Sequence, residues 1–500
     1  MAALRDAVLY GHEPAPLPWI ARRASYRWYV VGTVCIGAFM GQVDASMTQM
    51  LLPRLEADFH ARISTVSWVA VAYILAMATF MPTFGRLADM VSRKLLYTAG
   101  FLSFVLGSAL CGFAPTLGVL IAFRVLQGIG AALITANSIA IVVMAARPED
   151  RGRALGLQSA AQAVGLGAGP AIGGFILDTL GWHWLFWVNV PVGLVGALIG
   201  WLVLPQARSL KPSPFDWRGA LLIGPALTAL IALLNQGYAW GPTSPLFIGC
   251  GVLALVFLLL FVRAERGAAS PLIDFALLRK PAFVVGNIAN LLAFAMLFGL
   301  FFLIPFVLMR VYHDSALAAG LRLSLVPVML GLTAPVGGIL YDRFGARVAT
   351  ASGMVVCVAA LAILYVFLDG TRAHLLPVTL GLALFGVGQG LFVSPNTSAV
   401  MATAPADLTG EAGSLVNVVR FLGVSSGIAG ASSLLALTLA AITGHDGGTV
   451  GAPLAALVVA SHAVILLLAA MGMLSAALSL MRSAPHGPRR PDTAVAVDLA

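Results

Sequence analysis

Two residues of opposite charge lie inside long apolar segments of this chain. Asp44 stands nine residues before Pro53, and Arg124 stands seven residues after Leu117. With a helical rise of 1.5 Å per residue, they lie about 13 and 10 Å from the same predicted end of their helices. A charge at that depth in a bilayer costs roughly 2.5–3.5 kcal/mol unless it has a partner or faces water. Both are therefore candidate functional residues, and the alternative is a static buried pair that only fixes helix packing.

A second polar group lies in an apolar segment near the C-terminus. Arg420 stands nine residues after Glu411, and Asn417 shares its helix face, three residues before it. Arg420 is predicted either to bind an anionic group of a substrate or to act as a counter-charge to Asp44. The alternative is that Arg420 only contributes to helix packing, with its guanidinium bonded to backbone carbonyls. If Asp44 has no functional role, Glu411 is the next acidic residue that could have it. The residues predicted to face a cavity or substrate are Gln49, Asn137, Asn396, Asn417 and Arg420.

The composition predicts that membrane-spanning helices position these residues. The chain is 60% hydrophobic and 10% charged, whereas soluble domains carry about 25% charged residues. An apolar helix of about 20 residues crosses the ~30 Å hydrocarbon core of a bilayer. The sequence therefore predicts an all-α integral membrane protein with 14 spans. They lie near 28–52, 65–84, 95–114, 117–146, 154–177, 185–204, 218–236, 245–262, 282–309, 319–340, 348–367, 375–401, 411–440 and 452–481.

Lysine and arginine residues are distributed unequally between the two sides that these spans define. In loops and tails, 22 lie on the side of both termini and five on the opposite side. Because cytoplasmic loops carry the excess of positive charge, both termini are predicted to be cytoplasmic. The net charge of +9 then reflects orientation, and nucleic-acid binding is not predicted.

The sequence contains no motif that indicates an enzyme or a metal site. The four cysteines lack C-x-x-C spacing, which argues against a zinc site or a disulfide framework. A Walker A nucleotide-binding motif is absent as well. Neither a metal nor an organic cofactor is predicted, and any energy source has to be an ion gradient or the gradient of a substrate.

Internal repeats predict the domain organisation. GRLADMVSRK at 85–94 aligns with GILYDRFGAR at 338–347 at an offset of 253 residues, and 135–138 aligns with 394–397 at an offset of 259. Parallel repeats of this kind form two halves with a substrate site at their interface. The predicted divisions are a cytoplasmic N-terminal segment (1–27), a six-helix half (28–204), a central linker with two helices (205–281), a second six-helix half (282–481) and a cytoplasmic tail (482–500).

Several motifs resemble those of major facilitator transporters. LIAFRVLQGIGAA at 120–132 resembles their fourth-helix motif, and GLGAGPAIGG at 165–174 resembles the fifth-helix motif of the proton-driven exporters. WHWLFWVNVPVG (182–193), FDWRG (215–219) and PLIDFALLRKPAF (271–283) resemble signature segments of the 14-span drug:proton antiporters. The resemblance implies a major facilitator fold in which two six-helix halves flank a central helix pair, in a bacterial inner membrane.

The resemblance also implies roles for individual residues. Asp44, within VDASMTQMLLP, and Arg124 correspond to proton-coupling positions. The loop that contains Asp89 corresponds to a cytoplasmic gate, whose carboxylate interacts with the N-terminus of the helix near 411–440, where the helix dipole favours negative charge. A solvated loop that only sets orientation is the alternative. The gate residues are Gly85, Asp89, Arg93, Asp342 and Arg343, and the helix-packing residues are Gly165, Gly169, Pro170, Gly173 and Gly174.

The function predicted from these observations is secondary active transport. The protein is expected to export hydrophobic or amphipathic small molecules in exchange for protons, by alternating access, with the proton gradient as its energy source. The expected partners are the substrate, protons and the lipid bilayer, with a periplasmic adaptor if the host has an outer membrane. Two alternatives remain: a symporter or uniporter of a small metabolite in the same fold, and a non-transporting membrane sensor or assembly protein.

Overall fold

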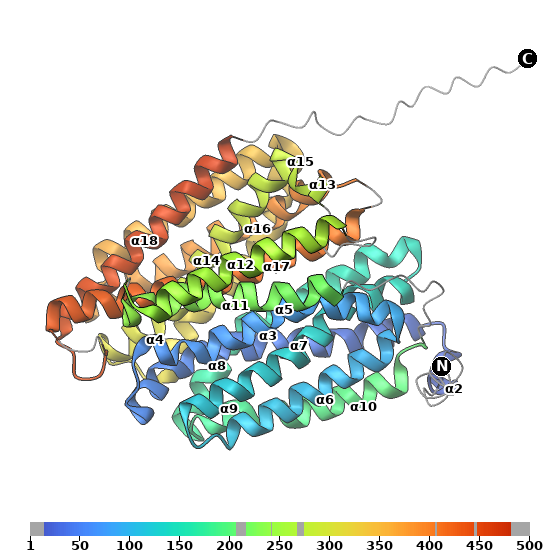
Figure 1. Ribbon diagram of the computed structural model, residues 1–500, viewed down its shortest axis with the longest axis horizontal. Coiled ribbons are helices and arrows are strands. Elements are labelled where there is room, and N and C mark those ends of the chain that lie inside the picture. The colour runs from blue at the N-terminus through green and yellow to red at the C-terminus, as the bar shows by residue number, and fades with distance from the viewer. Residues whose placement is uncertain are drawn as a thin grey trace, which may run out of the picture.

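The computed structural model describes residues 15–206, 217–241, 243–267, 275–405, 408–444 and 448–481. These parts of the chain contain helices and no strand, which confirms the predicted all-α architecture. The helices run roughly alongside one another, with the first half in blue to teal and the second half in yellow to red (Figure 1). The tail 482–500 and residues 1–14 of the N-terminal segment lie outside the described residues.

Long helices that pack against one another build the first half. α3 packs on α8, and α7 packs on both α5 and α6. The helices of this half are α2 (Pro18–Ala21), α3 (Tyr26–Phe59), α4 (Ile63–Val66), α5 (Trp68–Met90), α6 (Arg93–Gly112), α7 (Leu117–Ala145), α8 (Arg151–Thr179), α9 (His183–Trp187) and α10 (Asn189–Val203).

The second half has an equivalent set of contacts. α14 packs on α17 and α18, and α15 packs on α16 and α18. Its helices are α13 (Phe275–Leu278), α14 (Pro281–Arg310), α15 (Ala316–Phe367), α16 (Leu375–Ala402), α17 (Thr409–Thr443) and α18 (Leu454–Leu480), and the central pair is α11 (Trp217–Trp240) and α12 (Pro245–Gly267).

The number of helices that could cross a membrane differs from the predicted 14. Within the described residues, 12 helices are long and apolar enough, so the predicted count is not confirmed. The difference falls at two places. α15 is one 52-residue helix that covers two predicted spans, although Gly345 in its middle has a φ of +77°, a left-handed conformation that interrupts an α-helix. α11 is described completely only over Leu221–Gln236, so just this apolar part of the 24-residue helix enters the count.

Contacts between the halves run along two pairs of helices. α8 packs on α15, and α5 packs on α17. α11 contacts both α5 and α17, and its buried Asn235 joins them. The Asn235 amide donates to Ser67 Oγ at 2.8 Å, and Ser433 Oγ donates to the Asn235 carbonyl at 2.8 Å. The central pair is therefore attached to both halves, and the division of the chain into five segments stays a prediction.

Candidate functional site

Asp44 and Arg124 form an ion pair in the interior of the first half. Asp44 lies on α3 and Arg124 on α7, and Arg124 Nη1 is 2.7 Å from Asp44 Oδ2. Both side chains are fully buried. The similar depths expected from the sequence therefore correspond to direct contact. A buried pair with good hydrogen-bond geometry loses its stabilisation when either partner is removed, because the remaining charge is left in a low dielectric.

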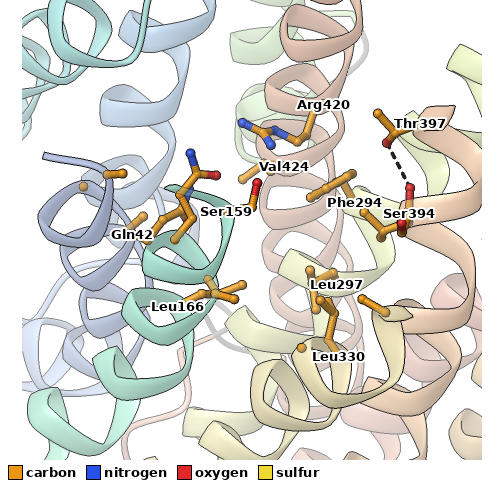
Figure 2. A pocket seen from close by; sticks show the side chains of 18 of the residues that line it. Gln42, Ser159, Leu166, Phe294, Leu297, Leu330, Ser394, Thr397, Arg420 and Val424 are labelled. Carbon is orange, nitrogen blue, oxygen red and sulfur yellow. Dashed lines mark hydrogen bonds between the residues drawn. The ribbon is translucent and has the colours of Figure 1, made fainter. Parts of the chain in front are cut away.

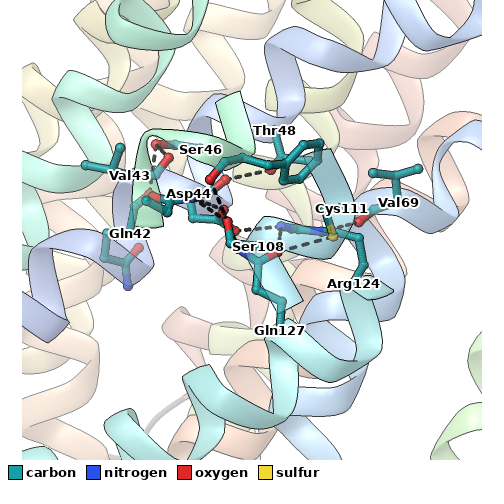
Figure 3. A network of polar contacts seen from close by, with 12 residues as sticks. Gln42, Val43, Asp44, Ser46, Thr48, Val69, Ser108, Cys111, Arg124 and Gln127 are labelled. Atoms are coloured by element: carbon teal, nitrogen blue, oxygen red, sulfur yellow. Dashed lines mark hydrogen bonds and ion pairs between the residues drawn. The ribbon is translucent and has the colours of Figure 1, made fainter. Parts of the chain in front are cut away.

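Two amides complete the contacts of the Asp44 carboxylate. Gln127 Nε2 donates to Asp44 Oδ1 at 2.8 Å (Figure 3), and Asn189 Nδ2 donates to the same oxygen at 2.8 Å. Both amide nitrogens also lie 3.2 Å from Ser108 Oγ. Ser108 in turn donates to the Phe186 carbonyl at 2.8 Å. The carboxylate thus accepts from three donors, an arrangement that suits its ionised form, which can only accept hydrogen bonds.

Arg124 has further contacts that hold its guanidinium in place. Its Nε donates to the Val69 carbonyl at 2.8 Å, and its Nη1 also donates to Gln127 Oε1 at 2.7 Å (Figure 3). The guanidinium lies 4.2 Å from the centroid of the Tyr73 ring, within the range of a cation–π interaction. Its Nη2 has no hydrogen-bond partner within the described part of the chain. Arg124 therefore keeps contacts of its own if Asp44 becomes neutral.

The sequence indicated part of this network. Asp44 and Arg124 were predicted, and Gln127 lies in the motif around Arg124, but Asn189 was missed. An asparagine inside the apolar segment 185–204 was the available signal, since a polar residue at membrane depth needs a partner. Its partner is 145 residues away in the chain, and sequence spacing does not reveal such a contact.

A separate cavity of about 680 Å³ lies between the two halves. It is lined by α3, α5, α7 and α8 of the first half and by α14, α15, α16 and α17 of the second. Gln42 and Ser159 lie on one side, opposite Arg420 and Phe294 (Figure 2). Asp44 does not line it, whereas Gln42 and Ala45, in the same turn of α3, do. The ion pair and the cavity therefore lie on different faces of α3.

Of the five predicted cavity residues, only Arg420 lines this cavity. Asn137 and Asn417 donate to carbonyls of their own helices, those of Leu133 and Gly413. Asn396 is buried and donates to the Gly286 carbonyl, and Gln49 is buried away from the cavity. Arg420 has no ion pair with Asp44, so the predicted counter-charge is wrong for this conformation. The lining polar residues that the sequence did not single out are Gln42, Thr135, Ser138, Ser159, Gln162, Ser394, Thr397 and Ser398.

The glycine motif of α8 lies between two helices. A Cβ at Gly165 would be 2.6 Å from the Phe39 carbonyl oxygen, and one at Gly173 would be 2.9 Å from Met47 Cβ, both on α3. Gly174 instead packs against the Ala316 carbonyl at the start of α15. Side chains larger than hydrogen do not fit at these backbone contacts. The motif thus brings α8 into close contact with α3 within one half and with α15 across the boundary.

Hydrogen bonds join the two halves at the end predicted to face outward. The Asp178 carboxylate accepts from the Ala316 and Leu317 N–H groups at 3.1 and 2.8 Å, at the N-terminus of α15. Glu56 is buried and accepts from the N–H and hydroxyl of Thr449. These contacts hold the two halves together at the predicted outer end.

Comparison with known proteins identifies the family. Residues 34–428 match the family described as Major Facilitator Superfamily. The chain belongs to the major facilitator superfamily. It is 34% identical to the riboflavin transporter RibZ of Clostridioides difficile over 83% of this chain and 89% of that protein. It is 31% identical to a multidrug resistance protein B homolog of Mycobacterium tuberculosis over 85% of this chain and 81% of that protein.

A solved structure has the same fold. The crystal structure of a mutant of the nucleoside transporter NupG aligns with a TM-score of 0.65 over 90% of this chain and 99% of that chain, at 12% identity. Together with the family match, this alignment confirms the predicted major facilitator fold. The protein is a multi-pass membrane transporter, and the 14-span antiporter subfamily stays a prediction.

The predicted gate residues of this major facilitator protein lie in two loops. Gly85 is near the end of α5, and Arg93 begins α6, where Ser92 Oγ accepts from the Leu95 N–H at 3.2 Å. The Asp89 side chain lies outside the described part, so its predicted contact with α17 is untested. The repeat-related Asp342 and Arg343 are exposed beside the break at Gly345.

Proposed function

We propose that this transporter exports amphipathic small molecules in exchange for protons, with Asp44 as the proton carrier. The observation that carries the proposal is the fully buried pair of Asp44 and Arg124, 2.7 Å apart, beside a cavity between the halves. An ionisable residue at membrane depth is expected to have a transport role. The relatives named as a multidrug resistance protein and as the tetracenomycin C resistance and export protein of Streptomyces glaucescens support the direction of transport.

The coupling would act through α3. Protonation of Asp44 removes its charge and weakens the contact with Arg124, which stays bound to Val69 and Gln127. Because Gln42 and Ala45 line the cavity from the same turn of α3, a shift of this turn changes the cavity lining. Because Gly165 has no side chain where α8 contacts the backbone of α3, α3 can shift along α8 there without a side-chain clash. Proton binding and substrate binding would then favour different positions of α3.

The conformation fits one state of an alternating-access cycle. Asp178 and Glu56 hold the two halves together at the end predicted to face outward. The cavity-lining residues of α8 and α16, at 159–166 and 393–398, lie in the halves of these helices nearer the opposite end. We infer an inward-facing state with both termini in the cytoplasm and 14 crossing segments, in which α15 contributes two and α11 one.

The proposal is tested by proton-driven export. Inverted vesicles or proteoliposomes with an imposed pH gradient are offered a panel of anionic, neutral and cationic fluorescent dyes, and wild type is compared with Asp44→Asn. Asp44→Asn keeps the size and the polarity of the side chain and removes its titration, so gradient-driven transport should be lost. Asp58→Asn is the matched control, because Asp58 pairs with Arg54 at an exposed site of the same helix. Unchanged gradient-driven flux in Asp44→Asn would remove Asp44 from the mechanism.

A further inference from the structure

The cavity between the halves carries a single charge. Among the described residues that line it, Arg420 is the only ionisable one, and no carboxylate is present. The Arg420 side chain points toward the cavity from α17, beside Phe294 and opposite Gln42 and Ser159 (Figure 2). The electrostatic potential of the cavity is therefore set by a guanidinium.

Arg420 has no anionic partner within the described ranges of the chain. Its neighbours include the rings of Phe294 and Phe421, whose centroids lie 5.6 and 5.0 Å from its guanidinium carbon. Arg124, the other arginine at membrane depth, is in contrast neutralised by Asp44 at 2.7 Å. A guanidinium offers five N–H donors in a planar fork that matches a carboxylate. In this structure the Arg420 guanidinium faces the cavity, next to these two aromatic rings.

We propose that the substrate is an amphipathic anion, whose carboxylate or comparable acidic group binds Arg420 while its apolar body lies against Phe294 and Leu297. A cavity of about 680 Å³ lies in the range of sites for drug-sized ligands, roughly 300–1,000 Å³. The apolar lining includes Leu166 and Leu330 on opposite halves (Figure 2). A lipophilic cation finds no carboxylate among these lining residues and is repelled by Arg420, so the site selects against it.

This assignment names the substrate class of the proposed exporter and rests on that function for the direction of transport. It has an electrical consequence, since one monoanion leaving in exchange for one entering proton moves two positive charges inward. Each charge that crosses the membrane changes the driving force by about 2.3 kcal/mol per 100 mV. An inside-negative potential would therefore drive export of an anion more strongly than export of a neutral compound.

Equilibrium binding to the full-length protein in detergent tests the substrate class without relying on proton coupling. The probes are dansylglycine, its neutral carboxamide and the cation ethidium, followed by fluorescence. Wild type should bind dansylglycine about tenfold or more tightly than the carboxamide, since charge-assisted hydrogen bonds distinguish the two, and it should not bind ethidium. Equal binding of the acid and the amide, or preferential binding of ethidium, would overturn the proposal.

Variants locate the anion site. Arg420→Gln should reduce dansylglycine affinity to that of the carboxamide and leave carboxamide binding unchanged, and that unchanged binding also shows that the cavity is folded. Arg420→Lys, which keeps the charge without the planar fork, should retain part of the preference for the acid. The matched control, Arg372→Gln, removes one positive charge from η2 (Arg372–His374), away from the cavity, and should bind like wild type.

A preference for the acid that survives in Arg420→Gln would refute the site. Loss of pH-driven flux with anion binding retained would instead count against the proposed antiport alone.

Discussion

Replacement of Gly169 on α8 tests the close contact between this helix and α3. A Cβ at this position would meet the Ser46 hydroxyl at less than contact distance and lie 2.9 Å from the Val43 carbonyl oxygen and 3.0 Å from Ser46 Cβ, all on α3. The hydroxyl is also fixed, since Ser46 Oγ donates to the Gln42 carbonyl at 2.8 Å. Gly169→Ala therefore requires the hydroxyl to rotate or the two helices to separate. Overpacking of this kind typically costs about 1–3 kcal/mol.

Gly169→Leu adds three more carbons at the same backbone contact and should abolish transport while the protein still inserts into the membrane. Stability is measured by thermal denaturation in detergent with a thiol-reactive coumarin maleimide, since Cys111 and Cys357 are buried and become reactive on unfolding. The matched control is Gly156→Leu on the same helix, where a Cβ meets nothing within 4 Å.

The double variant Gly169→Ala with Ser46→Ala isolates the cause. Removal of the Ser46 hydroxyl deletes the atom nearest to the new Cβ and leaves contacts at 2.9 and 3.0 Å, so part of the lost stability should return. If Gly169→Leu and Gly156→Leu denature at the same temperature and transport equally well, the reasoning from helix contact is refuted.

Three further predictions concern other parts of the structure. Asn189→Leu removes a donor at 2.8 Å from Asp44 and should shift the pH dependence of transport, whereas an unchanged pH profile would make Asn189 only a packing residue. Glu56→Gln weakens the buried contact with Thr449, so a cysteine placed in the cavity should react faster with a maleimide added from the outer side. An unchanged labelling rate would show that this contact does not hold the outer end closed. Single cysteines introduced into a variant without native cysteines should be labelled from the cytoplasmic side at two positions and from the outer side at two others. One position labelled from the wrong side would overturn the 14-span topology. The cytoplasmic positions are 92 and 206, and the outer positions are 243 and 444.

The helical class and the approximate ends of most spans could be predicted from the sequence. Apolar runs long enough for a bilayer and short charged breaks carry that information, because a backbone in lipid has to satisfy its own hydrogen bonds. The number of spans differs from the prediction where no loop separates two predicted helices. Gly345 interrupts the 52-residue helix α15 at a single residue, so two predicted spans follow one another without a loop.

The directions of the polar side chains could not be predicted. Asn137 and Arg420 both lie inside apolar helices, yet Asn137 turns to its own backbone and Arg420 faces the cavity. In a soluble helix, the polar face marks the side toward water. In a membrane helix the lipid and the protein interior are both apolar, so the pattern of hydrophobic residues does not indicate which face turns inward.

The sequence by itself determined which residues carry charge at membrane depth and how the α8 glycines are spaced. It placed Asp44 and Arg124 at similar depths because the helical rise is constant. Only the tertiary structure decided that Asn189 and Gln127 also bind Asp44, and that Arg420 faces the cavity with no carboxylate among the described residues that line it. Depth follows from distance along one helix, whereas contact depends on how separate helices are rotated against one another, and their packed side chains and glycine contacts set that rotation.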